Sequence, residues 1–233
     1  MKVRFRFSKQ GRVRWTSHRD VARMWERAFR RVALPLAYSQ GFSPRPRVSF
    51  GLALPTGAES VAEYLDVEVA EGAGVDLDVL PERLGAALPV GVDVTAAAPV
   101  EPGAGSLQEV VTSCDWVVET AGLSPGRLAA AVESAMAAPS LVITRERKGQ
   151  RSEQDVRPGI LACEVDGTSL VAELAAQPRA LRPSELLTAL GGDLVEVRVR
   201  RTSQWIQRDG AREEPLPLPL DATDAPHVVG RAS

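Results

Sequence analysis

The chain has 233 residues, of which 44% are hydrophobic and 25% charged, and its formal net charge is −2. These values are typical of a globular protein with one or two domains. No stretch reaches the roughly 18 consecutive apolar residues that a membrane-spanning helix needs, so we expect no membrane partner.

Basic residues are concentrated at the start of the chain. Residues 1–50 contain 13 lysines and arginines against Asp20 and Glu26, so they carry +11 and the remaining residues carry −13. This asymmetry has two interpretations that are equally open at this point. It indicates a polyanionic partner, or two regions that neutralise each other within the fold.

The two cysteines and the first seven residues of the chain give expectations about metal binding and cellular location. Cys114 and Cys163 are the only cysteines, and they form no CxxC pair, zinc motif or iron–sulfur motif. We therefore expect no metal and no cofactor. The opening residues MKVRFRF lack an apolar signal core. We expect a cytoplasmic protein with both thiols reduced.

The first predicted element is a strand over residues 2–7, where apolar and basic residues alternate. The two faces consist of Val3, Phe5 and Phe7 against Lys2, Arg4 and Arg6. We expect the strand to turn at Gln10-Gly11 and to resume through Arg12, Arg14 and Trp15.

A helix follows, for which Ser17 is a good N-cap with Asp20 three residues later. Pro35 ends it. Its apolar stripe is Val21, Met24, Trp25, Ala28, Phe29 and Val32. Nearly opposite that stripe lie Arg19, Arg23 and Arg30, with Arg27 and Arg31 beside them.

The remaining elements repeat one order twice. In the first half we expect strands at 47–54, 63–69 and 91–100 and a helix at 76–88. In the second half we expect strands at 115–120, 141–147, within 160–174 and at 194–201, a turn at 148–158, and helices at 124–138 and 182–190. The sequence therefore predicts an α+β fold with two tandem ferredoxin-like (βαββαβ) domains with antiparallel sheets. The domains would span 1–100 and 115–206, with a linker at 101–114 and a Pro-rich mobile tail at 207–233.

Several of these elements carry candidate phosphate contacts. The predicted open sheet face presents Lys2, Arg4, Arg6 and Arg47, with Trp15, Tyr38 and Phe42 available to stack on bases. The alternative is that the strand residues pair across strands with Asp66 and Glu68. A basic hairpin at 145–159 either extends a nucleic-acid groove through Arg145, Arg147, Lys148 and Arg151 or is merely solvated.

The helix arginines have only Asp20 and Glu26 as local partners, and their being all arginine favours bidentate phosphate or carboxylate contacts over a merely solvated face. His18 lies among them at the first helical turn. It is either structural or a general acid or base on a phosphodiester. No Ser/His/Asp set, Walker loop or GxGxxG motif accompanies it.

The stretch from residue 16 to 69 resembles a known family. The motif residues are Ser17, His18, Asp20, Glu26, Arg27, Arg30, Arg31, Leu34, Pro35, Tyr38, Ser39, Gly41, Phe42, Pro44, Pro46, Gly57, Ser60, Glu63 and Tyr64. In this pattern the chain is similar to the radical-SAM-linked proteins, the domain of unknown function 2344 family. It departs from the pattern at Arg19, Ser43 and Arg45, where the family favours Leu, Asn and His. The missing histidine weakens any metal or acid–base role for that loop.

The resemblance implies a partner, because members of the family are encoded beside, or fused to, a radical SAM protein. This chain has no CxxxCxxC motif and so cannot hold that cluster itself. Our leading hypothesis is a non-catalytic accessory protein that binds structured RNA, such as tRNA or rRNA, for a radical SAM enzyme. The expected RNA-binding residues are Arg19, Arg23, Arg27, Arg30, Arg31, Tyr38, Phe42, Arg45 and Arg47. The alternatives are a protein–protein adaptor that docks on an acidic face of that enzyme, and a metal-independent RNA endonuclease that uses His18.

Overall fold

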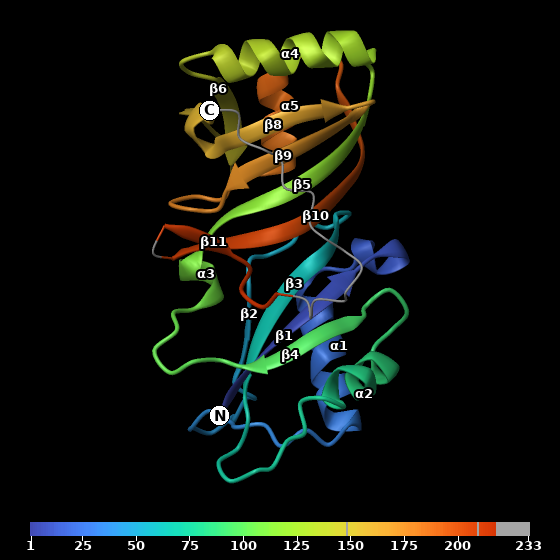
Figure 1. Cartoon of the computed structure of the whole chain (residues 1–233), viewed down its shortest axis with the longest axis vertical. Helices are drawn as coiled ribbons and strands as arrows, with labels where there is room; N and C mark the ends of the chain where they lie inside the picture. Colours follow the sequence, from blue (N-terminus) through green and yellow to red (C-terminus); the bar gives the residue numbers. More distant parts are fainter. Residues whose placement is uncertain (148, 209, 218–233) are drawn as a thin grey trace.

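The computed structural model describes residues 1–147, 149–208 and 210–217 (Figure 1). Its helices are α1 (His18–Arg31), α2 (Leu80–Ala87), α3 (Leu107–Val110), α4 (Pro125–Ala137) and α5 (Pro183–Leu190), with 3₁₀ turns η1 (Gly11–Trp15) and η2 (Arg157–Gly159). Its strands are β1 (Lys2–Lys9), β2 (Val48–Phe50), β3 (Glu59–Glu68), β4 (Val94–Pro99), β5 (Val111–Ala121), β6 (Val142–Arg147), β7 (Gln150–Asp155), β8 (Ile160–Asp166), β9 (Ser169–Ala175), β10 (Val195–Arg208) and β11 (Ala211–Glu213). In the described ranges no helix is both long and apolar enough to cross a membrane.

One sheet runs through the molecule in the strand order β4-β1-β3-β10-β5-β9-β8 (Figure 1). In addition, β2 pairs with β3 and β11 with β10, while β6 and β7 form a separate hairpin. Neighbouring strands are antiparallel except β3 and β10, which pair in parallel at Glu59–Arg200 and Ser60–Arg201. The prediction of an α+β chain with a mostly antiparallel sheet is confirmed.

The core of the first half (residues 1–100) lies between β1 and α1. Phe5 and Phe7 of β1 are buried, and the ring of Phe7 meets that of Trp25 edge-on at a centroid distance of 5.0 Å. The ring of Trp25 in turn packs against that of Phe29 at a centroid distance of 5.3 Å. The period-two pattern of the strand and the apolar stripe of the helix therefore face each other, as predicted. Aromatic side chains of this size dominate the burial that stabilises such a core.

A second core lies in the second half (residues 107–208). Leu128 of α4 and Leu186 of α5 are inaccessible to solvent, and they pack with alternate residues of β5 such as Val118. The helices predicted at 124–138 and 182–190 are confirmed to within one residue at each end.

Other boundaries differ from the prediction. Residues 11–15 form the 3₁₀ turn η1 and not a continuing strand, because Gly11 takes a positive φ of 65° after β1 ends. The predicted linker at 101–114 already contains α3 and the start of β5. Residues 150–155, predicted as part of a turn, form β7, whose polar side chains are mostly exposed and leave no alternating pattern.

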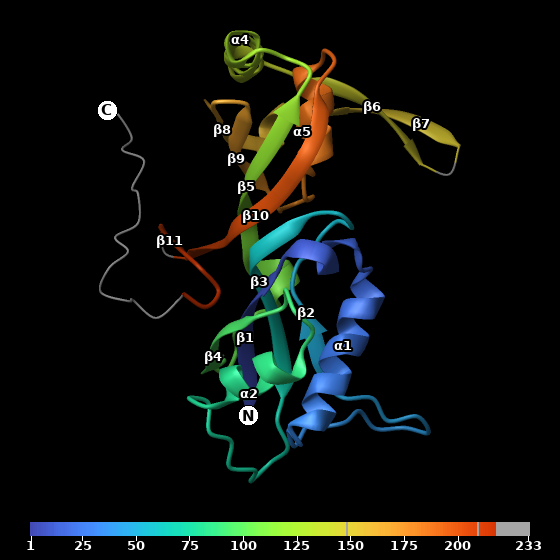
Figure 2. The ribbon, with the colours of Figure 1, turned by 90° about the vertical axis from the view of Figure 1, so that its right-hand side faces the viewer.

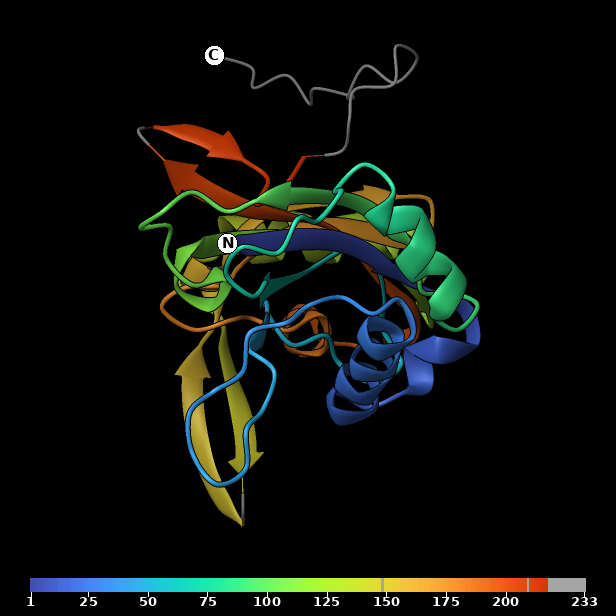
Figure 3. The ribbon, with the colours of Figure 1, turned by 90° about the horizontal axis from the view of Figure 1, so that it is seen from below.

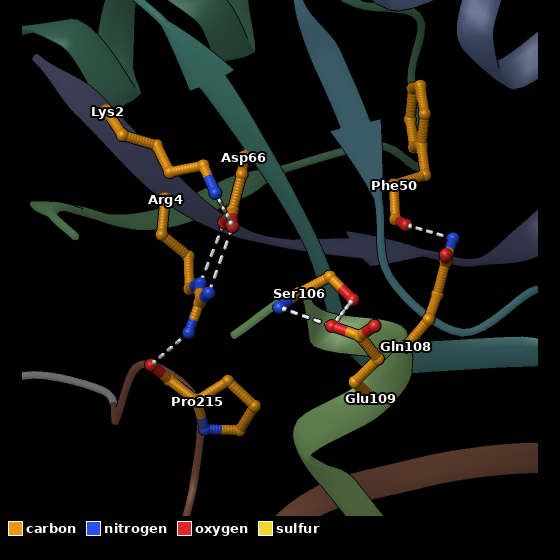
Figure 4. Close-up of polar contacts among 8 residues, drawn as sticks. All are labelled: Lys2, Arg4, Phe50, Asp66, Ser106, Gln108, Glu109 and Pro215. Carbon is orange, nitrogen blue, oxygen red and sulfur yellow. Dashed lines mark hydrogen bonds and ion pairs between the residues drawn. The ribbon is translucent and has the colours of Figure 1, made fainter. Parts of the chain in front are cut away.

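The predicted mobile tail is wrong for residues 207–217. Strand β10 continues to Arg208, because it pairs with β5 as far as Ile206–Val111, and β11 folds back on it. The segment after β11 then contacts β1: Arg6 forms an ion pair with Glu214, and Arg4 donates to the carbonyl oxygen of Pro215 at 3.3 Å (Figure 4). Residues 218–233 of the predicted tail lie outside the described ranges.

The sheet face expected to be open and basic is not open at β1. Arg4 and Arg6 are 6% and 4% exposed, and Arg4 makes a bidentate contact with Asp66 at 2.7 and 2.9 Å (Figure 4). Lys2 lies 3.7 Å from the same carboxylate. The alternative of cross-strand pairing with Asp66 is therefore confirmed for Lys2 and Arg4, because strands β1 and β3 are neighbours and a buried guanidinium requires a partner. Arg6 instead pairs with Glu214, which follows β11.

The two sides of the sheet differ. Helices α1 and α5, the loop that precedes β2 and the β6–β7 hairpin all lie on one side, and β11 lies on the other (Figures 2 and 3). The loop and the hairpin project from opposite ends of the molecule, with α1 between them (Figure 2). This arrangement places the predicted binding residues on one side of the sheet.

Candidate nucleic-acid interface

Helix α1 has a well-defined start and a fixed orientation. The Ser17 hydroxyl accepts a hydrogen bond from the Asp20 backbone N–H at 3.2 Å, which caps the helix. The same hydroxyl donates to the Asp20 carboxylate at 2.7 Å. This hydrogen bond, with Arg23 and Arg19 nearby, holds the pKa of Asp20 below its ordinary value. Trp25 and Phe29 anchor the opposite face in the core. The helix therefore presents its polar face in one orientation.

That polar face carries five exposed arginines, which we call the α1 arginines. They are Arg19, Arg23, Arg27, Arg30 and Arg31. Arg23 lies 3.5 Å from Asp20, and Arg31 donates to the carbonyl oxygen of Ala87 at 3.0 Å. Arg19, Arg27 and Arg30 have neither an ion pair nor a hydrogen bond from their side chains within the described ranges. At 1.5 Å per residue, the row from Arg19 to Arg30 is about 16 Å long.

The loop that follows α1 contributes exposed aromatic rings. Phe42 is fully exposed and Tyr38 is half exposed. The two ends of the loop are joined by hydrogen bonds. The Ser39 backbone N–H donates to the Arg45 carbonyl oxygen at 2.8 Å, and the Ser39 hydroxyl accepts from the Arg45 N–H at 3.0 Å. Arg45 is exposed, whereas Arg47 forms an ion pair with Glu68 at 2.9 Å. The predicted residues of the loop thus lie beyond the C-terminal end of α1 (Figure 2), with Arg47 already neutralised.

His18 lies at the other end of α1. Its ring packs edge-on against Phe50 at a centroid distance of 5.2 Å. Among the described residues it makes no side-chain hydrogen bond to a carboxylate that would orient it. The geometry therefore supplies no acid–base pair for the predicted catalytic role, which stays a prediction.

Next to His18 the structure contains a cavity that sequence reasoning did not find. This central cavity has a volume of about 680 Å³ and lies between the two halves. Its lining comes from the start of α1, the loop 52–56, β5, the end of β9, the loop 179–183, β6 and β10. The volume is in the range typical of small-molecule sites, roughly 300–1,000 Å³.

One wall of the central cavity is built on a shared carboxylate. Glu185 of α5 is buried, forms an ion pair with Arg145 at an Nε–Oε1 distance of 2.8 Å, and accepts from Arg179 at 3.1 and 3.2 Å. Its second oxygen also accepts from the Arg182 backbone N–H at 2.9 Å, which caps α5. Two guanidinium groups therefore share one negative charge, and the wall keeps a net positive charge.

A group of three buried side chains, Cys114, Trp116 and Arg201, forms part of the cavity lining. The guanidinium of Arg201 lies 5.3 Å from the ring centre of Trp116, and the Cys114 thiol lines the cavity with them. Burial raises the pKa of that thiol to about 11. Cys114 is therefore protonated near neutral pH and is a structural residue, not a nucleophile.

The predicted binding residues do not all lie together in the structure. It places the five α1 arginines on one helix face and joins that face to the central cavity through His18. In the hairpin, Arg145 points to Glu185, and the exposed Arg151 lies 3.7 Å from Glu146. Lys148 lies outside the described residues, as does the side chain of Arg147. The sequence does not identify Arg179, Arg182 and Glu185 as site residues, because Arg145, with which Glu185 pairs, lies 40 residues earlier in the chain.

Comparison with known proteins gives one finding. A family model described as "Uncharacterized protein conserved in bacteria (DUF2344)" matches residues 2–183. This range includes α1, the loop that follows it and the cavity residues Arg145, Arg179 and Arg182, which together with Glu185 we call the arginine wall; Glu185 lies just beyond the range. The comparison with curated proteins yields no match.

Proposed function

The chain belongs to DUF2344, an uncharacterized family conserved in bacteria, and we propose that it is an accessory protein that binds structured RNA through the α1 arginines. The observation that carries this proposal is the exposure of Arg19, Arg27 and Arg30, which lack side-chain partners within the described ranges. Three guanidinium groups that form no ion pair with any described residue, on a helix anchored by its buried face, form a positive surface that does not depend on a flexible segment.

The chemistry of arginine supports a phosphate partner. Its planar fork of N–H donors matches a phosphate in bidentate geometry, and the charge persists at any physiological pH. Phosphate contacts of this kind supply most of the affinity of non-specific nucleic-acid binding. The exposed rings of Phe42 and Tyr38, with Arg45 in the same loop, add surfaces on which unpaired bases would stack.

We further propose that each half is a ferredoxin-like unit. The strand orders β4-β1-β3-β2 and β10-β5-β9-β8 support this assignment. In each half, counted along the chain and leaving out the β6–β7 hairpin, a helix follows the first strand and another follows the third. The β6–β7 hairpin would then be an insertion in the second unit. Because β3 and β10 pair, the two units would share one sheet.

The partner and location are also proposals. The resemblance to radical-SAM-linked proteins supports a radical SAM enzyme as the partner that acts on the bound RNA in the cytoplasm. A second candidate function is an adaptor that docks on an acidic face of that enzyme, because the same guanidinium forks bind carboxylates as well as phosphates.

The test is binding of the purified chain to total cellular RNA and to total tRNA at low and high salt, with RNA integrity followed on the same gel. RNA binding predicts tight association that weakens steeply with salt while the RNA stays intact. An absence of binding at low salt would contradict the proposal and would favour the adaptor. Loss of intact RNA would instead favour the endonuclease, provided that His18→Ala abolishes the cleavage.

A further inference from the structure

The central cavity has the features of a binding site for an anionic group. Arg145, Arg179 and Arg182 line it, and Glu185 is the one carboxylate that pairs with them among the described residues. Each guanidinium has five N–H groups. Arg179 uses its Nη1 on Glu185, whereas Arg145 uses Nε on Glu185 and Nη1 on Gln154. Donors remain for a ligand.

This arginine wall is held in place before any ligand arrives. Glu185 belongs to the first turn of α5, is 7% exposed, and fixes both guanidinium groups at hydrogen-bond distance. A ligand would therefore not have to order two long side chains, which is a main cost of binding anions with flexible residues. Preorganisation of this kind distinguishes the cavity from the α1 arginines, three of which are unconstrained by contacts.

Other residues of the cavity lining suit a flat, largely apolar body with polar edges. Leu52, Leu54 and Leu181 supply apolar contacts. The backbone N–H groups of Ala53 and Leu54 bond to no other described residue, so they are free to contact ring nitrogen or oxygen atoms. A nucleobase combines these properties, and enzymes and binding proteins that extrude a base hold it between apolar side chains and read its edge.

The cavity also lies where an RNA strand on α1 would lead. His18 lines the cavity and is the first residue of α1, followed directly by Arg19. A strand whose phosphates follow the α1 arginines towards the N-terminus of the helix therefore reaches the mouth of the cavity.

We propose that the central cavity receives a single nucleotide of the bound RNA strand, with its phosphate on Arg145 and Arg179 and its base between the loop 52–56 and Leu181. This inference rests on the proposed RNA-binding function and deepens it. It makes the junction of the two halves the place where one nucleotide is separated from its neighbours. A nucleoside 5′-monophosphate has the same chemistry and serves as the free probe.

The experiment uses the full chain and two probes. Calorimetry measures binding of adenosine and uridine 5′-monophosphates, of the corresponding nucleosides and of inorganic phosphate. Fluorescence anisotropy measures binding of a labelled RNA stem-loop. The cavity variants are Arg179→Gln, which removes one guanidinium, and Ala53→Trp, which fills the cavity from an exposed position and keeps the arginine wall. The matched control is Arg127→Gln on α4, outside the cavity lining.

We expect Arg179→Gln to weaken stem-loop binding about tenfold, the effect of losing one charged hydrogen-bonding contact. Ala53→Trp should weaken it by a similar factor because the indole occupies the space of the nucleotide, while Arg127→Gln should change it less than about twofold. The monophosphates should bind more tightly than the nucleosides, and the stem-loop should displace them. The double variant Arg27→Gln/Arg30→Gln should weaken stem-loop binding and leave monophosphate affinity unchanged.

Three outcomes would overturn this inference. If the cavity variants bind the stem-loop as the wild type does while the α1 variant does not, the cavity assignment fails and the proposed function stands. If the wild type binds no RNA at low salt, the proposed function itself fails. If monophosphates bind but the stem-loop does not displace them, the cavity holds a free nucleotide and not a nucleotide of the strand.

Discussion

Arg201 of β10 and Glu63 of β3 form a buried ion pair across the junction of the two halves. The Nη2–Oε1 distance is 2.6 Å and the Nε–Oε1 distance is 3.0 Å. Both side chains are under 10% exposed, and Arg201 also donates to the carbonyl oxygen of Leu52 at 2.9 Å. The parallel contact between β3 and β10 thus depends on a charged pair and not only on backbone pairing.

Arg201→Ala should destabilise the whole chain strongly. The substitution leaves the Glu63 carboxylate buried without its partner, and removal of one member of a buried pair typically costs about 3–5 kcal/mol. Urea unfolding followed by tryptophan fluorescence would measure the change. The double variant Arg201→Met/Glu63→Leu removes both charges and should recover most of the loss. A loss under about 1 kcal/mol for Arg201→Ala would show that water replaces the pair.

Part of this fold could be predicted because its signals are local. Strand β1 buries Val3, Phe5 and Phe7, and α1 buries Trp25 and Phe29, so each element shows its own period in the sequence. The same stripe placed the α1 arginines on the opposite, exposed face. Their exposure is confirmed, while their contact with RNA stays a prediction.

The rest required tertiary contacts that leave no local signal. Pairing of Arg4 with Asp66 was one of two alternatives, and the second alternative, an open basic face, fails partly because residues 214–217 cover it. Their Pro-rich composition indicated a tail, yet Pro215 supplies a carbonyl acceptor that needs no regular structure. The arginine wall joins Arg145, Arg179 and Glu185 from β6, a loop and α5, which only the folded second half brings together.

Removal of arginine charges from α1 should weaken RNA binding and should reduce the dependence of the affinity on salt concentration. Arg27→Gln/Arg30→Gln removes two charges that lack partners within the described ranges. The slope of log affinity against log salt should fall by about 0.7–0.9 for each lost phosphate contact. Anisotropy titrations over a salt series would measure it.

The control for this variant carries the same loss of charge elsewhere. Arg127→Gln/Arg208→Gln changes α4 and the end of β10, and its slope should stay at the wild-type value. Equal slopes for the two double variants would mean that net charge, and not the face of α1, determines binding.

Glu59 should make stability depend on pH in the acid range. Its carboxylate is inaccessible and accepts from the Gly11 N–H and from Arg198 Nε, both at 2.8 Å, while Arg198 Nη2 forms an ion pair with it at 2.7 Å. Burial alone would raise the pKa of Glu59, but these contacts outweigh it and hold the pKa below its ordinary value of 4.5. The stabilisation is therefore complete above pH 4.5 and is lost as the pH falls through the folded-state pKa.

The measurement compares wild type with Glu59→Gln, which keeps an acceptor for Gly11 but removes the charge. At neutral pH the variant should be less stable by about 1–3 kcal/mol. The difference should be constant down to about pH 5 and should shrink at lower pH. A difference that grows as the pH falls would contradict the assigned sign.

The segment that covers β1 should stabilise the first half. Deletion of residues 214–233 removes Glu214, the partner of the 4% exposed Arg6, and uncovers the side chain of Tyr64, against which Leu216 packs. A buried charge without its partner should lower the free energy of unfolding by about 1–3 kcal/mol. Deletion of residues 218–233 alone keeps Glu214 and Leu216 and is the matched control.

Glu214→Gln, which keeps the covering segment, should reproduce part of the loss, because the amide accepts from Arg6 without a charge. Urea unfolding of the three variants would measure these changes in the free energy of unfolding. Equal stability for the two deletions would show that residues 214–217 do not stabilise the sheet.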